Sequence, residues 1–213
     1  MPNPITSHQV PTLLIKMKYP KQFDGVALCI GAFIPDFTYF CIQLRHISHS
    51  ILGQLYWTLP LTLILTPVFY RYLAPLFSKL AEKDWLISKP LRFFGVDELN
   101  ILKKKKFDGK FFLITSYSAL IGGLTHLLLD IPSHGYIELF YPWIILKLFD
   151  IYFIPIFDFS LFPFIDLSFL PTIKIAELIW IIEELTLLFI SLYLFRYIKK
   201  NQLIKSWNES NSK

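Results

Sequence analysis

Residues 111–131 read FFLITSYSALIGGLTHLLLDI, an apolar run of the length that crosses a lipid bilayer. A transmembrane helix needs about 20 predominantly apolar residues, because the hydrocarbon core of a bilayer is about 30 Å thick. The run also carries small residues, among them Gly122 and Gly123, which let neighbouring helices approach closely. It therefore predicts a membrane-spanning helix inside a helical bundle.

Two other segments meet the same length criterion. Residues 51–72 are apolar throughout, and their Pro60 and Pro67 can kink a membrane helix without destroying it. Residues 175–197 form the third predicted span. Residues 24–44 and 140–170 are also apolar but are interrupted by prolines, so each of them could span, re-enter or lie at the interface.

The composition agrees with a membrane protein. Hydrophobic residues make up 54% of the chain and charged residues only 17%, whereas a soluble domain carries about 25% charged residues. The sequence therefore predicts an all-α, multi-pass membrane bundle. Residues 1–200 form its single membrane-embedded domain, and residues 201–213 form a polar C-terminal tail.

The distribution of basic residues predicts the orientation. Residues 73–110 contain nine Lys and Arg, whereas residues 132–174 contain only Lys147 and Lys174. The positive-inside rule makes 73–110 a basic cytoplasmic loop, so the residues just before 51 and just after 131 face outward. The lysines near the N-terminus would suit the cytoplasm equally well, which leaves the sidedness of that region open.

Two classes of partner have no support in the sequence. The lysine run at 103–106 lacks the interleaved aromatic residues of a nucleic-acid interface, and it predicts a solvated loop near anionic lipid headgroups. No phosphate loop or dinucleotide fingerprint occurs, so no nucleotide cofactor is expected. Membrane lipids are the expected partners.

Ionisable side chains in the apolar segments are the candidate functional residues, because such groups are expensive to bury in a membrane. Asp36, Asp130 and one of the adjacent Glu183 and Glu184 are the acids of this kind. All five histidines lie in or beside short apolar-flanked segments: His8, His46, His49, His126 and His134.

The pattern HxxxDxxxH is the most specific of these signals. Its His126 and Asp130 are four residues apart and share one face of a helix. Pro132 is expected to end that helix, so that His134 folds back toward the same point. Imidazole and carboxylate groups are the ligands of catalytic zinc. The alternative is a structural His–Asp pair that is hydrogen-bonded inside the bundle.

The remaining candidates are expected near this pair. His49 directly precedes the span at 51–72, and the predicted topology puts it on the same side of the membrane as Asp130. His46 and His8 could equally be surface histidines. Asp36 follows Pro35 in an apolar run, where a carboxylate either caps a helix or needs a cation, a metal or several hydrogen-bond donors.

Four motifs in order carry a family resemblance. They are S-H at His8, G-x-x-x-P-D-F at 31–37, H-S-x-x-G at 49–53 and G-x-x-x-H-x-x-x-D-x-x-x-H-G at 122–135. With them the chain resembles the uncharacterised prokaryotic membrane family called domain of unknown function 4184. That family is similar to membrane-bound metal-dependent hydrolases and, more remotely, to zinc-dependent phospholipase C.

The resemblance implies a ligand set for one or two divalent metal ions, with zinc expected. The soluble phospholipase-like enzymes have a further late H-x-x-x-E pair, but no histidine follows His134 here, so a full trinuclear site is not expected. The implied metal ligands are His8, Asp36, His49, His126, Asp130 and His134.

The expected function is a metal-dependent hydrolase, most specifically a phosphoesterase acting on a lipid or lipid-linked substrate at the outer membrane surface. Asp36 is expected to orient the attacking water and move its proton, and Arg45 to pair with a substrate phosphate. The alternative is a non-catalytic membrane protein that binds a metal for structure or transport. Without a metal, a membrane scaffold remains.

Overall fold

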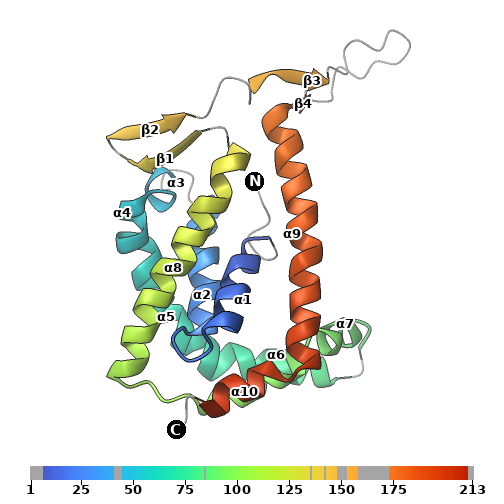
Figure 1. The fold of residues 1–213 in the computed structure, drawn as a ribbon. Helices are drawn as coiled ribbons and strands as arrows, with labels where there is room; N and C mark the ends of the chain where they lie inside the picture. Colours follow the sequence, from blue (N-terminus) through green and yellow to red (C-terminus); the bar gives the residue numbers. More distant parts are fainter. Residues whose placement is uncertain are drawn as a thin grey trace, which may run out of the picture.

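The computed structural model describes residues 7–40, 45–83, 85–134, 136–141, 143–147, 153–157 and 173–210. These residues form a bundle of long helices with shorter elements across both ends (Figure 1). In chain order its helices are α1 (Gln9–Lys18), α2 (Gly25–Phe33), the 3-10 helix η1 (Ile34–Phe40), α3 (Arg45–Ser48), α4 (Ile51–Gly53), the π-helix η3 (Gln54–Thr58), α5 (Leu59–Val68), the π-helix η4 (Phe69–Leu73), α6 (Ala74–Glu82), α7 (Ser88–Phe93), the 3-10 helix η5 (Val96–Lys104), α8 (Gly109–His134), α9 (Ile175–Lys200) and α10 (Leu203–Ser210).

Three helices are long and apolar enough to cross a membrane: Ile51–Glu82, Gly109–Ile131 and Ile175–Lys200. They contain the three predicted spans at 51–72, 111–131 and 175–197. Their outer faces carry large exposed apolar side chains, among them Ile64, Leu113 and Phe189. Such faces suit a lipid environment, because exposed apolar surface on this scale marks a membrane or protein contact.

The first of these helices is continuous but irregular. Two π-helical segments, η3 and η4, alternate with the regular helices α4, α5 and α6. Pro60 and Pro67 lie within α5, each close to a π-helical segment, as expected where a missing backbone N–H changes the hydrogen-bond pattern. The helix continues to Glu82, so the predicted cytoplasmic loop at 73–110 begins as helix and continues as α7 and η5.

The ambiguous segment at 24–44 forms a short helix in its described part, and its last four residues lie outside the described residues. The apolar helix Gly25–Thr38 is below the length of a membrane span. It packs on α8 at backbone distance, because Gly31 lies against Ala119 and Gly122 lies against the carbonyl of Leu28. A Cβ atom at Gly122 would overlap that carbonyl, so this helix pair depends on glycine.

Two short antiparallel strand pairs add to the expected all-α fold. Strand β1 (Tyr136–Phe140) pairs with β2 (Ile144–Lys147), and β3 (Pro155–Phe157) pairs with β4 (Ile173–Lys174). Both pairs fall in or beside the ambiguous segment at 140–170. The rest of that segment lies outside the described residues.

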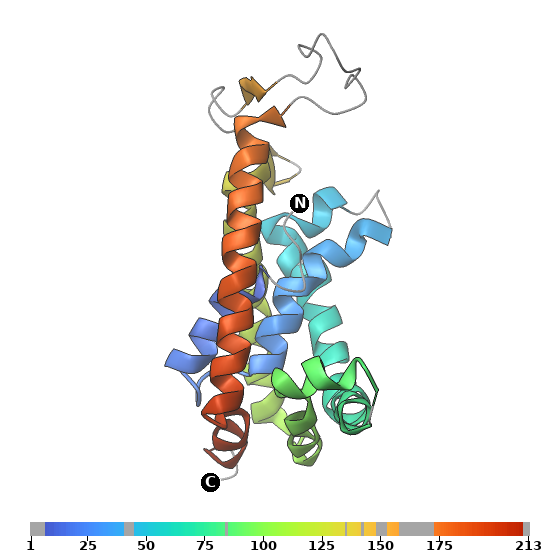
Figure 2. The same ribbon diagram turned by 90° about the vertical axis from the view of Figure 1, so that its right-hand side faces the viewer.

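Both ribbon views separate two ends of the bundle (Figures 1 and 2). Helices α3 and α4 and the strand pairs lie at one end, which we call the strand end. Helices α6, α7 and α10 lie at the other, which we call the basic end. Helix α9 runs between the two ends and packs on α1 through Val10, Leu13, Leu194 and Ile198. The predicted polar tail at 201–213 contains α10, which lies across the basic end.

Candidate metal centre

Four separate parts of the chain bring histidine and aspartate side chains together toward the strand end. His8 directly precedes α1, and Asp36 lies in η1 after α2. His49 lies between α3 and α4, while His126 and Asp130 are one turn apart on α8. All five side chains are buried or nearly so, the most exposed being His49 at 12%.

Two imidazole nitrogens and two carboxylate oxygens form the centre of this cluster. Nε2 of His49 lies 3.4 Å from Nε2 of His126. Oδ1 of Asp36 is 3.2 Å from the His49 nitrogen and 3.6 Å from the His126 nitrogen. Oδ2 of Asp130 is 3.6 Å from the His49 nitrogen and 3.2 Å from the His126 nitrogen.

These distances fit a shared metal ion. Zinc ligands lie about 2.0–2.1 Å from the ion, so two ligand atoms of a tetrahedral site are roughly 3.3 Å apart. The five distances among the His49, His126, Asp36 and Asp130 atoms run from 3.2 to 3.6 Å. The atoms of His49, His126 and Asp130 therefore have the mutual spacing of three ligands in one coordination shell, and Oδ1 of Asp36 has the same spacing from both imidazole nitrogens.

The hydrogen bonds of the second ring nitrogens orient both histidines as ligands. Nδ1 of His126 lies 2.8 Å from the carbonyl oxygen of Ala32, to which only a protonated nitrogen can donate. The neutral ring therefore keeps its lone pair on Nε2, which faces the cluster. Metal-bound histidines are held by such a bond to a carbonyl or carboxylate.

A relay of two hydroxyls has the same effect on His49. Thr38 Oγ1 donates to the carbonyl of Pro35, so it accepts at 2.9 Å from Ser48 Oγ. Ser48 Oγ therefore has only its lone pairs left for Nδ1 of His49, 2.9 Å away, and the nitrogen donates. The lone pair of His49 Nε2 then also faces the carboxylates.

His8 extends the cluster on the other side of Asp130. Its Nε2 lies 3.6 Å from Oδ1 of Asp130, whereas the two central imidazoles approach Oδ2. The His8 ring stacks on that of His126, with ring centroids 4.0 Å apart. Two groups of three residues have ligand atoms within 4.8 Å of one another: His8, Asp36 and His126, and His49, His126 and Asp130. Asp130 thus has Oδ1 near His8 and Oδ2 near His49 and His126.

Burial supports the presence of a cation. Two carboxylates lie close together with little access to solvent, and burying a charge is costly unless a cation or hydrogen-bond donors neutralise it. Oδ2 of Asp36 is buried and has no hydrogen-bond partner among the described residues. The donor set therefore fits a divalent metal with nitrogen and oxygen ligands.

Five of the six predicted ligands come together in this way: His8, Asp36, His49, His126 and Asp130. The side chains of the sixth, His134, and of Arg45 lie outside the described residues. The expected break at Pro132 is wrong, because α8 continues through it to His134. Pro132 is in the last turn, where its missing N–H removes a single helical bond. Within the described chain, Glu183 and Glu184 do not belong to either ligand group.

The supporting residues Thr38, Ser48 and Ala32 were not predicted from the sequence. Ser48 directly precedes a candidate ligand, and the Thr38 hydroxyl is two residues from Asp36. Their closeness in sequence to predicted ligands is therefore what could have identified Ser48 and Thr38. The Ala32 carbonyl has no such signal, because any residue type supplies it.

The chain belongs to the family described as Domain of unknown function (DUF4184), whose model matches residues 1–159. This range includes every residue of the cluster. No curated protein and no solved structure matches the chain in the corresponding searches.

Proposed function

We propose that this member of the DUF4184 family is a multi-pass integral membrane hydrolase that depends on a divalent metal ion, most specifically zinc. The proposed reaction is the hydrolysis of a phosphoester in a lipid or lipid-linked substrate at the outer surface of a prokaryotic cytoplasmic membrane. The observation that carries the proposal is the spacing of the ligand atoms: those of His49, His126 and Asp130 lie 3.2 to 3.6 Å from one another, and Oδ1 of Asp36 lies 3.2 and 3.6 Å from the two imidazole nitrogens.

Zinc, when bound, supplies a Lewis acid for a phosphoryl oxygen and lowers the pKa of water from 15.7 to about 7. The protein holds the ligands in place through Ala32 and the Ser48–Thr38 relay. In the proposal, His49, His126 and Asp130 are the primary ligands. His8 stands on the far side of Asp130, where it orients this carboxylate or contributes to a second ion.

Asp36 is the proposed proton acceptor. Its Oδ1 lies beside the two imidazole nitrogens, and its buried Oδ2 is not hydrogen-bonded to a described residue. A carboxylate in this position can accept a proton from water and later return it to the leaving group. Arg45 begins α3, three residues before Ser48, and its proposed partner is the substrate phosphate.

The location supports a membrane substrate. His126 and Asp130 lie in the last two turns of the candidate span Gly109–Ile131, toward the strand end. The basic elements lie at the opposite end, and the positive-inside rule assigns that end to the cytoplasm. A centre at the other end of a span meets lipid headgroups before soluble substrates, which favours lipid or lipid-linked phosphoesters.

A second candidate function is a non-catalytic metal site that stabilises the bundle or takes part in metal transport. Its support is the enclosure of the centre, since no side chain of the cluster is more than 12% exposed. Structural zinc sites are closed by four protein ligands, whereas catalytic sites keep one position for water. If Asp36 is a ligand, the four atoms close the shell.

Metal content tests the shared premise. We expect the purified protein to contain about one or two equivalents of metal by plasma mass spectrometry. His126→Ala and Asp130→Ala should each remove most of it. Asp108→Asn is the matched control, because Asp108 caps the opposite end of the same helix through the N–H of Phe111. A protein that stays metal-free after reconstitution, with ligand variants that only unfold more readily, would support the scaffold interpretation.

Asp36→Ala separates the two functions. If Asp36 is the proton acceptor, the variant keeps its metal and loses hydrolysis of phospholipid substrates in mixed micelles. If Asp36 is the fourth ligand of a closed site, the variant loses metal instead. Wild-type protein that is fully loaded with zinc and hydrolyses no phosphoester would favour the structural or transport role.

A further inference from the structure

A cavity of about 300 Å³ lies at the basic end, away from the metal centre. Residues of α1, α2, η4, η5, α9 and α10 line it, so its wall is formed by segments from both halves of the chain. Its volume is at the lower end of the range of small-molecule sites, about 300–1,000 Å³. Most of the wall is apolar, including Leu13, Leu99, Leu102 and Ile198.

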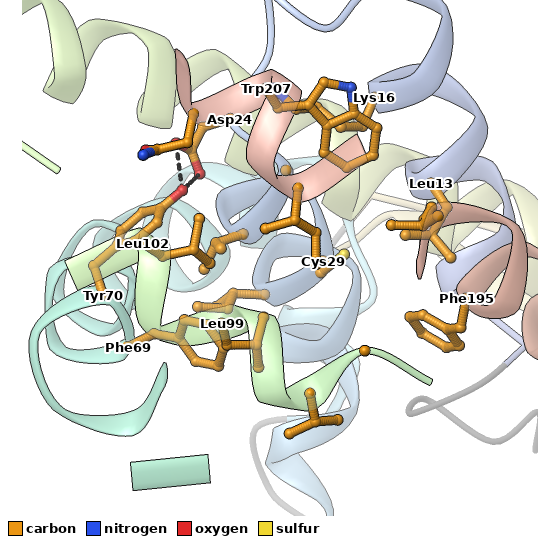
Figure 3. Close-up of a pocket in the computed structure, with 18 of the residues that line it drawn as sticks. Leu13, Lys16, Asp24, Cys29, Phe69, Tyr70, Leu99, Leu102, Phe195 and Trp207 are labelled. Carbon is orange, nitrogen blue, oxygen red and sulfur yellow. Dashed lines mark hydrogen bonds between the residues drawn. The ribbon is translucent and has the colours of Figure 1, made fainter. Parts of the chain in front are cut away.

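Charged groups occupy part of the wall. Asp24 accepts hydrogen bonds from the hydroxyl of Tyr70 and from the backbone N–H of Ala27, as Figure 3 shows for the tyrosine. Nζ of Lys105 lies 3.4 Å from Oδ2 of Asp24, and its side chain is 20% exposed. This carboxylate is thus already bonded, and the lysine remains accessible to another anion.

Lys16 adds a second positive charge that is almost fully buried. Its ammonium donates to the backbone carbonyls of Pro20 and Phe23 and lies 5.3 Å from the ring centroid of Trp207. Burial lowers the pKa of Lys16 to about 8, and the nearby Asp24 only partly opposes this effect. With Asp24 negative and two lysines positive, the cavity has an uncompensated positive charge that an anion would neutralise.

We propose that this cavity binds one acyl chain of an anionic phospholipid, with the lipid phosphate at Lys105 and Lys16. The apolar wall suits a hydrocarbon chain, and the two ammonium groups suit a phosphate monoanion. Basic pockets between transmembrane helices on the cytoplasmic side bind anionic lipid headgroups in this way. The site does not depend on the metal centre, since the two share no side chain.

The test measures phospholipid that stays bound to the detergent-purified protein, after extraction and mass spectrometry. We expect roughly one phosphatidylglycerol per wild-type chain, as one cavity of this size allows. Leu99→Trp fills the cavity and should abolish retention. Lys105→Gln should lower phosphatidylglycerol affinity about tenfold, the usual effect of losing a charged hydrogen bond.

Two controls match these variants. Lys106→Gln removes an exposed lysine that is next in sequence but does not line the cavity, and Leu113→Trp adds the same bulk on an exposed face of α8. Both should retain lipid as the wild type does. Equal retention in all five proteins would mean that the lipid is annular, and it would overturn the proposal. Equal retention of phosphatidylcholine would overturn the recognition of an anion.

A second measurement uses the fluorescence of Trp207, which lines the cavity, and needs only the Trp207→Phe variant. In nanodiscs of phosphatidylcholine with brominated phosphatidylglycerol, the wild type should show a quenched fluorescence component that Trp207→Phe lacks. If wild type and Trp207→Phe are quenched to the same fractional extent, no brominated chain reaches the cavity and the proposal fails. Metal content should remain unchanged in every cavity variant, which separates this result from the fate of the hydrolase proposal.

Discussion

Each central imidazole of the cluster is oriented by a hydrogen bond on its other ring nitrogen. His126 donates to a backbone carbonyl, which no side-chain substitution removes, but His49 depends on the hydroxyl of Ser48. That hydroxyl is in turn fixed by Thr38. The two histidines therefore differ in how easily their orientation can be changed without removing a ligand.

This difference leads to a prediction for Ser48→Ala. Without the hydroxyl, Nδ1 of His49 loses its acceptor, so the ring can rotate or take the other tautomer. Loss of such a supporting bond typically lowers metal affinity about 10–100-fold. We expect a fall of this size in a chelator competition titration, with Thr38→Val showing a smaller effect.

Ser116→Ala is the control for this prediction. Ser116 donates to the carbonyl of Phe112 in its own helix, its one hydrogen bond among the described residues, and it lies far along α8 from the cluster. Its substitution should leave metal affinity unchanged. Equal affinities for Ser48→Ala and wild type would show that the relay does not orient His49.

The candidate metal ligands could be predicted from the sequence, but the residues that orient them by hydrogen bonds could not. The spacing of His126 and Asp130 places both on one helical face whatever the tertiary structure is, because a turn of helix has 3.6 residues. Asp36 and His8 were identified only by chemistry and resemblance, since nothing local shows that η1 and the start of α1 meet α8. The Ser48–Thr38 relay requires two chain segments in a specific register, which spacing along the sequence does not give.

Among the elements, the α2–α8 pair places two of the four chain segments that supply the cluster. Asp36 follows α2, and His126 and Asp130 lie on α8, so the spacing of these helices fixes the distance between carboxylate and imidazole. Close contact at Gly31 and Gly122 sets that spacing. A larger residue at this interface should therefore affect both stability and metal binding.

We expect Gly122→Ala to destabilise the protein, because the added Cβ would overlap the Leu28 carbonyl. Overpacking of this kind costs about 1–3 kcal/mol, and each kcal/mol lowers the melting temperature by about 2–4 °C in a chain of this size. Thermal unfolding in detergent measures the shift. Metal affinity should fall as well, since the two helices move apart.

Gly109→Ala provides the comparison, because a Cβ atom there meets nothing within 4 Å. This variant should melt at the wild-type temperature or slightly above it, as alanine favours helix. A Gly122→Ala protein as stable as Gly109→Ala would mean that the helices adjust without cost, and that the close approach does not determine the geometry of the centre.

Element prediction worked best where length and hydropathy suffice. The three helices that are long and apolar enough to cross a membrane could be predicted from their length and hydropathy alone. The extension of the first helix beyond residue 72 through α6 to Glu82 was not predicted, because Lys79 and Glu82 resemble the start of a loop. The short strand pairs after α8 were not predicted, because hydropathy does not distinguish the paired strands from the other apolar residues around them.

In the whole molecule, two buried polar clusters lie toward opposite ends of the helices. The His–Asp centre lies toward the strand end, and the Asp24, Lys16 and Lys105 groups lie at the basic end. In the proposed orientation the first cluster serves the outer leaflet and the second binds lipid of the inner leaflet. Both proposals about lipid therefore depend on which end faces the cytoplasm.

Labelling of single cysteines tests this orientation in a background with Cys29→Ala and Cys41→Ala. Trp143→Cys reports on the strand end, while Glu82→Cys and Lys205→Cys report on the basic end; all three positions are exposed. In right-side-out membrane vesicles, a membrane-impermeant maleimide should label only Trp143→Cys. The other two should react after the vesicles are permeabilised, because nine basic residues between 73 and 110 hold that end inside.

Two other labelling results would contradict this prediction, one about the orientation of the protein and one about whether it crosses the membrane. If Glu82→Cys and Lys205→Cys are labelled first and Trp143→Cys is protected, the ends are reversed and the metal centre faces the cytoplasm. An outer-surface substrate would then be wrong, but the ligand geometry would still fit a metal, since it does not depend on orientation. If all three positions react equally before permeabilisation, the long apolar helices do not separate the two ends across a bilayer, and the multi-pass assignment fails with the lipid proposals that rest on it.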